Sequence, residues 1–349
     1  MNIIRQLASG SAIAICIILF NISLSAQLTG GGYANSYLHR DVGARAIGMA
    51  GAYTALSNDP LAMFYNPAGL SDLNSAPSFN VMYSSLDFNR YQTTLFYGQK
   101  LSEHFAIGGG INTFGSGSFM MRDIRNNAIR EISSNDYSFS LGASYNIEFA
   151  ALGASVKYLS NSLYGVSGNL SGYSVDIGSK FNVMDMFTFG LAIQNLFNHS
   201  QYSDGIKEES KIPYTIRTGI AFEIPFGISY EEDTRDTYTG ASESRRITSR
   251  RYLAVDVDAR YMQFQHYPSL IVGMEFAPHS IIAFRAGIEV FGENKSEATF
   301  LPMNYWGAGV ALKPFISSIN LPLSLEYSIS SDYLAFQKIG HHVSVNIDF

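Results

Sequence analysis

The sequence is almost without cysteine. Its 349 residues include one, Cys16, which lies in an N-terminal segment that we expect to be removed. The mature chain is therefore predicted to contain no thiol. That would exclude disulfide bonds, a cysteine nucleophile and a zinc site with cysteine ligands.

Charge is also scarce. Asp, Glu, Lys and Arg together make up 15% of the residues, against about 25% in typical soluble domains. The formal net charge is −6. Without residues 1–26, which carry one basic and no acidic residue, 22 Lys and Arg remain against 29 Asp and Glu, a net charge of −7. A negatively charged chain of this kind does not favour nucleic acid as a partner.

Long apolar runs are missing after residue 26, where no stretch approaches the ~18–20 residues of a membrane-spanning helix. Aromatic residues are nevertheless frequent, at 13%, with 22 Tyr and 24 Phe. In a transmembrane β-barrel each strand alternates lipid-facing and lumen-facing side chains, so its average hydropathy stays near zero. We therefore predict an all-β fold, a transmembrane antiparallel β-barrel.

The N-terminal segment has the order of a secretory signal peptide. Arg5 supplies a positive charge, Ala12 to Phe20 form a short apolar core, and Ser23 to Ala26 offer mostly small residues before a cleavage point. This order predicts a signal peptide over residues 1–26, because the apolar run is too short for a membrane anchor. A retained N-terminal helix is the alternative interpretation.

Two segments show the alternation of a barrel strand most clearly. "DYSFSLGASYNI" (Asp136 to Ile147) places apolar or aromatic side chains at every second position, and "GYSVDIGSKFNV" (Gly172 to Val183) repeats the pattern. Such strict alternation indicates a strand with one apolar face. Each segment is about twice as long as the ~5–6 residues of an average globular strand, which favours a membrane-spanning strand.

Weaker alternation predicts further strands, giving about fourteen within a barrel domain over residues 78–349. An even number is the rule for single-chain bacterial barrels, with twelve or sixteen as alternatives here. The further strands are expected near residues 78–87, 89–100, 104–114, 149–159, 187–195, 213–223, 251–262, 268–276, 281–290, 304–313, 321–329 and 340–349.

The predicted connections alternate in length, as expected of short periplasmic turns and longer outer loops. Long polar outer loops are predicted at 116–135, 160–171 and 196–212. Residues 230–251 break the rule, because a long charged segment stands where a short turn is expected. It is interpreted either as a docking surface for a partner protein, or as a solvated loop or an extra hairpin.

Residues 27–77 lack the alternation and are predicted to form a separate N-terminal unit, here called the hatch. Asn58 or Asp59 is suited to cap a short helix with Pro60 at its first position. Asn66 would end that helix, because the residue before a proline disfavours helix, and would cap a second helix starting at Pro67. The hatch is too polar for lipid, so we expect it in the barrel lumen or across the periplasmic mouth. Its motif residues are Asn58, Asp59, Pro60, Asn66, Pro67, Ala68 and Gly69.

The stretch "GARAIGMAGAYTALSNDPLAMFYNPAGLS" (Gly43 to Ser71) resembles the N-terminal signature of FadL-like outer-membrane proteins, which include the fatty-acid transporter FadL and the PorV/PorQ proteins. The resemblance implies a fourteen-stranded barrel plugged by an N-terminal hatch. It also implies that the last strand, which ends in the aromatic Phe349, serves as a barrel assembly signal.

Candidate lumenal residues are Asp256, Asp258 and Arg260, which share one face of a predicted strand. The seven histidines are scattered along the chain, and no G-x-S-x-G nucleophile elbow occurs in a strand–turn–helix setting. Adjacent His341 and His342 point to opposite faces of a strand, which disfavours a shared metal site. We therefore predict no catalytic residues, no metal site and no cofactor.

The function expected from the resemblance is a hatch-gated conduit for hydrophobic small molecules in the bacterial outer membrane. Its partners would be outer-membrane lipid and a hydrophobic ligand, or a detergent molecule in its place, in the lumen. The alternative is a PorV/PorQ-like component of type IX secretion that docks cargo or a secretion-system protein. The sequence alone does not separate the two roles.

Overall fold

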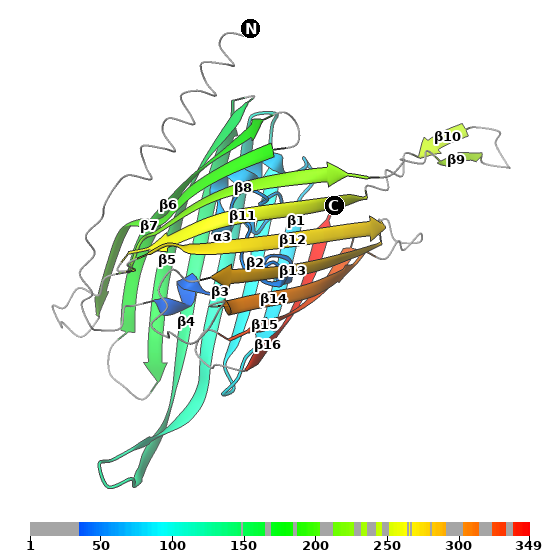
Figure 1. Ribbon diagram of the computed structural model, residues 1–349. Coiled ribbons are helices and arrows are strands. Elements are labelled where there is room, and N and C mark those ends of the chain that lie inside the picture. The colour runs from blue at the N-terminus through cyan, green and yellow to red at the C-terminus, as the bar shows by residue number, and fades with distance from the viewer. Residues whose placement is uncertain are drawn as a thin grey trace.

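The fold is a closed antiparallel barrel (Figure 1). The predicted signal peptide, residues 1–26, and residues 27–34 of the hatch lie outside the residues that the structure describes. The computed structural model describes residues 35–147, 149–164, 169–183, 187–202, 212–226, 232–235, 242–245, 251–263, 265, 267–279, 281–290, 303–313, 323–332 and 338–349.

Fourteen strands form the barrel, and each pairs with two antiparallel neighbours. The predicted fold class is confirmed, and a barrel strand lies at each position where the sequence predicted one. The strands are β1 (Ser78–Ser85), β2 (Tyr91–Lys100), β3 (Phe105–Arg122), β4 (Ala128–Asn146), β5 (Ala150–Tyr164), β6 (Asn169–Val183), β7 (Phe187–Tyr202), β8 (Thr215–Pro225), β11 (Tyr252–Met262), β12 (Ser269–His279), β13 (Ile282–Val290), β14 (Met303–Leu312), β15 (Leu323–Ser331) and β16 (Ile339–Asp348).

The first and last strands close the barrel. β1 pairs with β16 from Ser78 opposite Asp348 to Ser85 opposite His341. The backbone N–H of Phe349 donates to the carbonyl of Pro77 at 3.0 Å. The ring of Phe349 meets that of Phe79 edge-on, with centroids 6.0 Å apart. The terminal aromatic residue is thus part of the closing seam, and its role as an assembly signal stays a prediction.

Strands β3 to β7 are 15 to 19 residues long, beyond the ~9–11 residues that cross a membrane. The sequence prediction of long loops at 116–135, 160–171 and 196–212 is therefore wrong for much of their length. Strands β3 and β4, for example, stay paired to Arg122 opposite Ala128. In the extensions of β4 and β7 polar residues fall on both faces, as Arg130 and Glu131 do in β4, so the alternation that reveals a strand is lost although backbone pairing continues.

The exceptional segment between β8 and β11 contains a small hairpin. Strands β9 (Glu232–Arg235) and β10 (Ser242–Arg245) pair with each other in a sheet separate from the barrel. This matches one of the interpretations offered by the sequence, the extra hairpin. The remainder of the predicted loop 230–251, apart from Arg251, lies outside the described residues.

The two faces of the barrel wall differ in polarity. Large apolar side chains are exposed on the outside, and polar or charged ones are buried on the inside, which is the arrangement of a membrane barrel. Among the outer residues are Tyr83, Leu95, Leu141, Leu152, Val156, Tyr158, Leu270, Phe284, Leu325 and Val343. Among the inner ones are Asn80, Gln92, Thr94, Asn112, Ser155, Ser174, Asp256, Asp258, Glu275 and Glu326.

The described hatch residues lie inside this barrel and are almost entirely buried. Helix α2 contacts β13 to β16, and helix η2 contacts β2 to β6, so the hatch touches opposite sides of the wall. No helix among the described residues has the length and apolar character needed to cross a membrane. The hatch helices are η1 (Ser36–His39), α2 (Ala44–Gly48), α3 (Ala62–Tyr65) and η2 (Pro67–Asp72).

The two short helices near the prolines differ in how they begin. Helix α3 starts at Ala62, later than the predicted start at Pro60, because the carboxylate of Asp59 accepts from the N–H of Leu61 and forms a turn first. Helix η2 starts at Pro67, and the side chain of Asn66 caps it by accepting from the next free backbone N–H. Both helices are short, so their positions depend on contacts with the wall.

Candidate functional site

The candidate functional site is the lumen, where the hatch meets the inner wall. Glycines on many strands face the hatch at this contact, and we call them the glycine belt. A Cβ atom at Gly307 would lie 1.9 Å from the carbonyl oxygen of Ile47, and one at Gly153 would lie 2.3 Å from the nitrogen of Ala68. The belt therefore lets the hatch backbone lie directly against the strands. Its members are Gly98, Gly108, Gly142, Gly153, Gly178, Gly190, Gly219, Gly273, Gly287 and Gly307.

Two of the predicted lumenal residues bind the hatch backbone. Asp258 on β11 accepts from the N–H groups of Tyr53 and Thr54 at 3.0 Å each, and from the Thr54 hydroxyl at 2.6 Å. Asp256 accepts from the N–H of Leu56 at 3.0 Å. Both carboxyl groups are fully buried, so their hydrogen bonds to the hatch replace those that water would make.

The third predicted lumenal residue, Arg260, lies on the same face of β11 but in a different set of contacts. It pairs with Glu289 on β13 and lies 3.7 Å from the carboxylate of Asp41 in the hatch. Asp41 also meets Arg217 at 3.5 Å, and Arg217 donates to the carbonyl of Gly51 at 3.2 Å. The lumen at this level is therefore crossed by ion pairs between hatch and wall.

Arg45 in helix α2 makes the most extensive of these contacts. Its guanidinium donates two hydrogen bonds to Glu275 on β12, at 3.0 and 2.9 Å. It also donates to Tyr53 at 2.8 Å, Asn58 at 2.7 Å and Asp59 at 3.2 Å. The Arg45 side chain thus links Glu275 on the wall to the hatch segment from Tyr53 to Asp59. Bidentate pairs of arginine and carboxylate are among the stronger hydrogen-bonded contacts in proteins.

Asn66 joins the hatch to the opposite side of the wall. Its amide nitrogen donates to the carbonyls of Thr54 in the hatch, at 3.0 Å, and Ser179 on β6, at 3.1 Å. Its amide oxygen accepts from the N–H of Ala68 at 3.2 Å. The Asn66 amide thus bonds to three backbone groups. A side chain that lacks either the donor or the acceptor cannot make all three hydrogen bonds.

The other hatch motif residues occupy two environments. Asn58 is exposed and Asp59 half-buried, at the contact with Arg45. The rest are buried against the hatch or the wall, and a Cβ atom at Gly69 would lie 2.3 Å from the carbonyl of Ser57. These buried residues are Pro60, Pro67, Ala68 and Gly69.

We expect Asn66→Ala to destabilise the hatch by about 1–3 kcal/mol, since two buried carbonyls lose their donor and a helix loses its cap. Asn74→Ala is the matched control, because the Asn74 side chain is exposed. Thermal unfolding and trypsin cleavage of the hatch in the folded barrel measure the effect. Equal behaviour of the two variants would contradict the role given to the Asn66 side chain.

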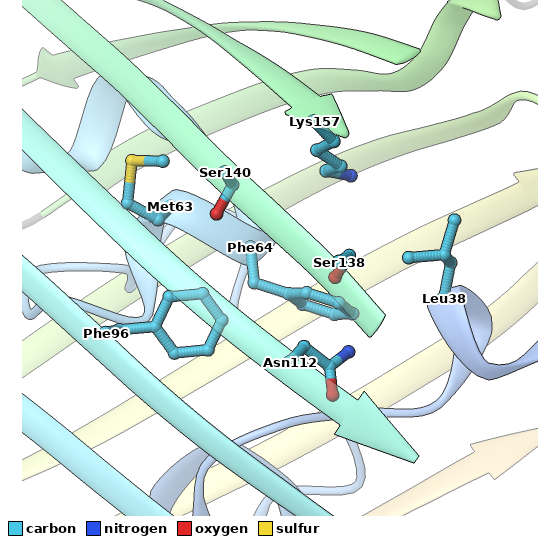
Figure 2. Close-up of a pocket in the computed structure, with 8 residues that line it drawn as sticks. All are labelled: Leu38, Met63, Phe64, Phe96, Asn112, Ser138, Ser140 and Lys157. Carbon is cyan, nitrogen blue, oxygen red and sulfur yellow. The ribbon is translucent and has the colours of Figure 1, made fainter. Parts of the chain in front are cut away.

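A small cavity of about 10 Å³, the space of about one water molecule, lies between hatch and wall (Figure 2). The hatch side of this cavity is apolar, and the wall side is polar apart from one phenylalanine. Pockets for small molecules typically measure about 300–1,000 Å³, so this cavity is too small for a solute in this arrangement. The lining residues are Leu38, Met63, Phe64, Phe96, Asn112, Ser138, Ser140 and Lys157.

The histidines that the structure describes lie in several different elements. Burial, and then the positive charges of Arg260, Lys157 and Arg217, lower the pKa of His39 to about 3, so it is neutral at neutral pH. His199 lies within strand β7 and not in an outer loop as predicted, because β7 continues to Tyr202. The others that the structure describes lie at turns, at strand ends or on opposite faces of β16: His104, His279, His341 and His342. His266 lies outside the described residues.

Neither the glycine belt nor the contacts of Arg45 were predicted from the sequence. A signal for the belt exists, because single glycines interrupt strands whose other positions alternate regularly, as Gly178 does in β6. Such a glycine indicates close backbone approach. For Arg45 no comparable signal exists, since nothing in the sequence relates it to Glu275, 230 positions away.

Comparison with known proteins rests on structure alone. No protein-family model and no curated protein matches the sequence. The toluene transporter TodX of Pseudomonas putida superposes with a TM-score of 0.52 at 13% identity, covering 88% of this chain and 96% of that one. The monoaromatic hydrocarbon channel CymD gives 0.52 at 12% identity, covering 88% and 97%. A FadL homologue of Pseudomonas aeruginosa gives 0.47 at 10% identity, covering 88% and 98%.

These likenesses bear on the fold. The chain folds as a closed antiparallel barrel of fourteen strands, the strand number that the resemblance of its N-terminal stretch implied, and this fold is similar to those of TodX and CymD. Identities of 12–13% do not carry a substrate from one protein to another. The PorV/PorQ branch is not among the similar structures named above.

Proposed function

We propose that the protein is a hatch-gated conduit for small hydrophobic molecules in the bacterial outer membrane. The observation that carries the proposal is a hatch seated inside a closed barrel, with apolar side chains turned to a cavity between hatch and wall. The neighbours support this reading, since TodX is named a toluene transporter and CymD a monoaromatic hydrocarbon channel. The outward apolar surface of the strands suits a lipid bilayer.

The transport step needs no energy source. An apolar solute gains about 25 cal/mol for each Å² that leaves water, so it partitions into an apolar site and leaves when its concentration falls on the other side. Because the cavity holds about one water molecule, passage requires the hatch to move relative to the wall. The hatch is held by separable hydrogen bonds and ion pairs, each of which contributes little net free energy when water can replace it.

A disulfide between hatch and wall tests the need for this movement. The backbone N–H of Ala44 lies 2.9 Å from the hydroxyl of Ser344 on β16, so Ala44→Cys with Ser344→Cys places two thiols close together. Toluene uptake into proteoliposomes is expected to stop when the pair is oxidised and to return on reduction. A cross-strand pair, Thr93→Cys with Thr113→Cys, is the control, because it joins β2 to β3 and leaves the hatch free. Undiminished uptake with the hatch bonded to β16 would overturn the proposal.

The alternative role in type IX secretion receives no support from the likenesses reported above, so it is not proposed here. The hairpin β9–β10, which the sequence offered as one interpretation of the charged segment, identifies no partner by itself.

A further inference from the structure

The cavity between hatch and wall has two chemically different sides. Leu38, Met63 and Phe64 come from the hatch and are apolar. The wall side is contributed by β2 to β5 and is mostly polar, with Asn112 on β3 among its residues. A polar wall at this point does not favour a plain hydrocarbon as the ligand. Hydroxyl and amide groups form no hydrogen bond with an alkane or an unsubstituted ring.

Asn112 holds a hydrogen-bond donor without a partner. Its side chain is buried, with 2% of the residue exposed. The amide oxygen accepts from Gln92 at 3.1 Å, whereas the amide nitrogen has no partner within the described structure. Figure 2 shows Asn112 beside the ring of Phe64 and across from Phe96. Buried amide donors are nearly always paired, so this one indicates a site whose acceptor comes from outside the chain.

Among the described residues that line the cavity, the one cation is already neutralised. Lys157 forms an ion pair with Asp176 on β6, with 2.5 Å between nitrogen and oxygen, and both side chains are buried. Its ammonium group also lies 5.9 Å from the centroid of the Phe64 ring, within the range of a cation–π contact. The cavity therefore offers an aromatic position and a donor, but no unpaired charge for a carboxylate.

We propose that this cavity is the closed form of a binding site for small neutral aromatic molecules that carry one acceptor oxygen, the phenol class. When the hatch withdraws, the ligand ring takes the position of the Phe64 ring, against Phe96 and under the ammonium group of Lys157. The ligand oxygen accepts from the amide nitrogen of Asn112. This inference rests on the proposed function, because the ligand reaches the cavity only if the hatch moves.

The amide donor of Asn112 determines which ligands the proposed site prefers. A site built to hydrogen-bond an oxygen discriminates against an analogue that lacks it, and a single neutral hydrogen bond corresponds to roughly a threefold to tenfold difference in affinity. Phenol is therefore expected to bind more tightly than toluene by about that factor, after allowance for their different partition out of water. Benzoate is expected to bind more weakly than phenol, since its charge would be buried without a free counter-ion.

The test uses the full-length protein in detergent for binding and in proteoliposomes for uptake, with phenol and toluene as probes. Binding is followed by ligand-observed NMR and uptake by the amount of probe retained. Asn112→Leu removes the donor, and Asn112→Asp replaces it by an acceptor of similar size. Both variants are expected to lose the preference for phenol, which is measured as the ratio of phenol to toluene affinity. Thr94→Val is the matched control, because it removes a buried unpartnered hydroxyl on β2 that does not line the cavity.

The outcomes separate this inference from the proposed function. An unchanged ratio of phenol to toluene affinity in both Asn112 variants, with toluene still bound, would overturn the phenol site and leave the conduit standing. Absence of uptake of either probe by the native protein would overturn the conduit, whereas phenol binding in detergent that depends on Asn112 would still support the site. If one Asn112 variant fails to form a heat-resistant barrel, the other provides the comparison.

Discussion

Replacing Gly307 with alanine is expected to displace the hatch from the barrel wall. The new Cβ atom would lie 1.9 Å from the carbonyl oxygen of Ile47 and within 3.1 Å of the nitrogen of Ala50. Both are backbone atoms that no rotamer change can move. Overpacking of this kind costs about 1–3 kcal/mol, which raises the population of the displaced hatch by roughly tenfold to a hundredfold.

Two measurements report on that displacement. Trypsin cleaves after Arg40 or Arg45, which are largely shielded while the hatch is seated, and planar-bilayer conductance rises when the lumen is open. Gly109→Ala is the control, because its Cβ atom would meet only ordinary contacts at 3.4 Å and beyond. Both variants carry the same substitution in a strand, so a strand effect would appear in both. A Gly307→Ala barrel as resistant to trypsin and as closed as Gly109→Ala would show that the glycine belt does not seat the hatch.

Most of the wall could be predicted from the sequence because a barrel strand has one lipid face and one lumenal face. That requirement enforces alternation over residues 136–147 and 172–183, and with less regularity elsewhere. The alternation is weaker in the paired extensions of β3 and β4, residues 116–122 and 128–135, which is why the sequence predicts a loop there. Pairing there depends on backbone hydrogen bonds, which leave no period in the side chains.

The hatch could be predicted as a unit but not in its contacts. Asx–Pro steps specify local turns, because the side chain caps a helix and the proline fixes the backbone, and both steps lie at short helices in the structure. Asn66 and Arg45 of the hatch bond to strand residues, and Asp258 on β11 bonds to the hatch, in each case across more than a hundred positions of the chain. Such pairings depend on where the closed barrel places each strand, and a single sequence carries no record of it.

Arg45→Ala is expected to be the most damaging single change in the ion pairs between hatch and wall. It removes both hydrogen bonds to Glu275 and those to Tyr53 and Asn58 in one step. Removing one partner of a buried pair typically costs about 3–5 kcal/mol, because the other charge stays buried. Here the loss is reduced to the extent that Arg285 still pairs with Glu275. We therefore expect the lower end of that range, measured as loss of hatch protection against cleavage at Arg40.

A double-mutant cycle separates the pair from the rest of the network. Glu275→Gln keeps the size of the side chain and removes the charge, so Arg45→Ala should cost less in that background by the coupling free energy of the pair. Lys338→Ala is the control for loss of a cation, because its pair with Asp87 spans 3.8 Å and the lysine side chain is 57% exposed; exposed pairs contribute about 0–1 kcal/mol. Equal effects of Arg45→Ala with and without Glu275 would mean that Arg45 acts through the hatch alone. The pair with Glu275 would then contribute no coupling free energy to holding the hatch against the wall.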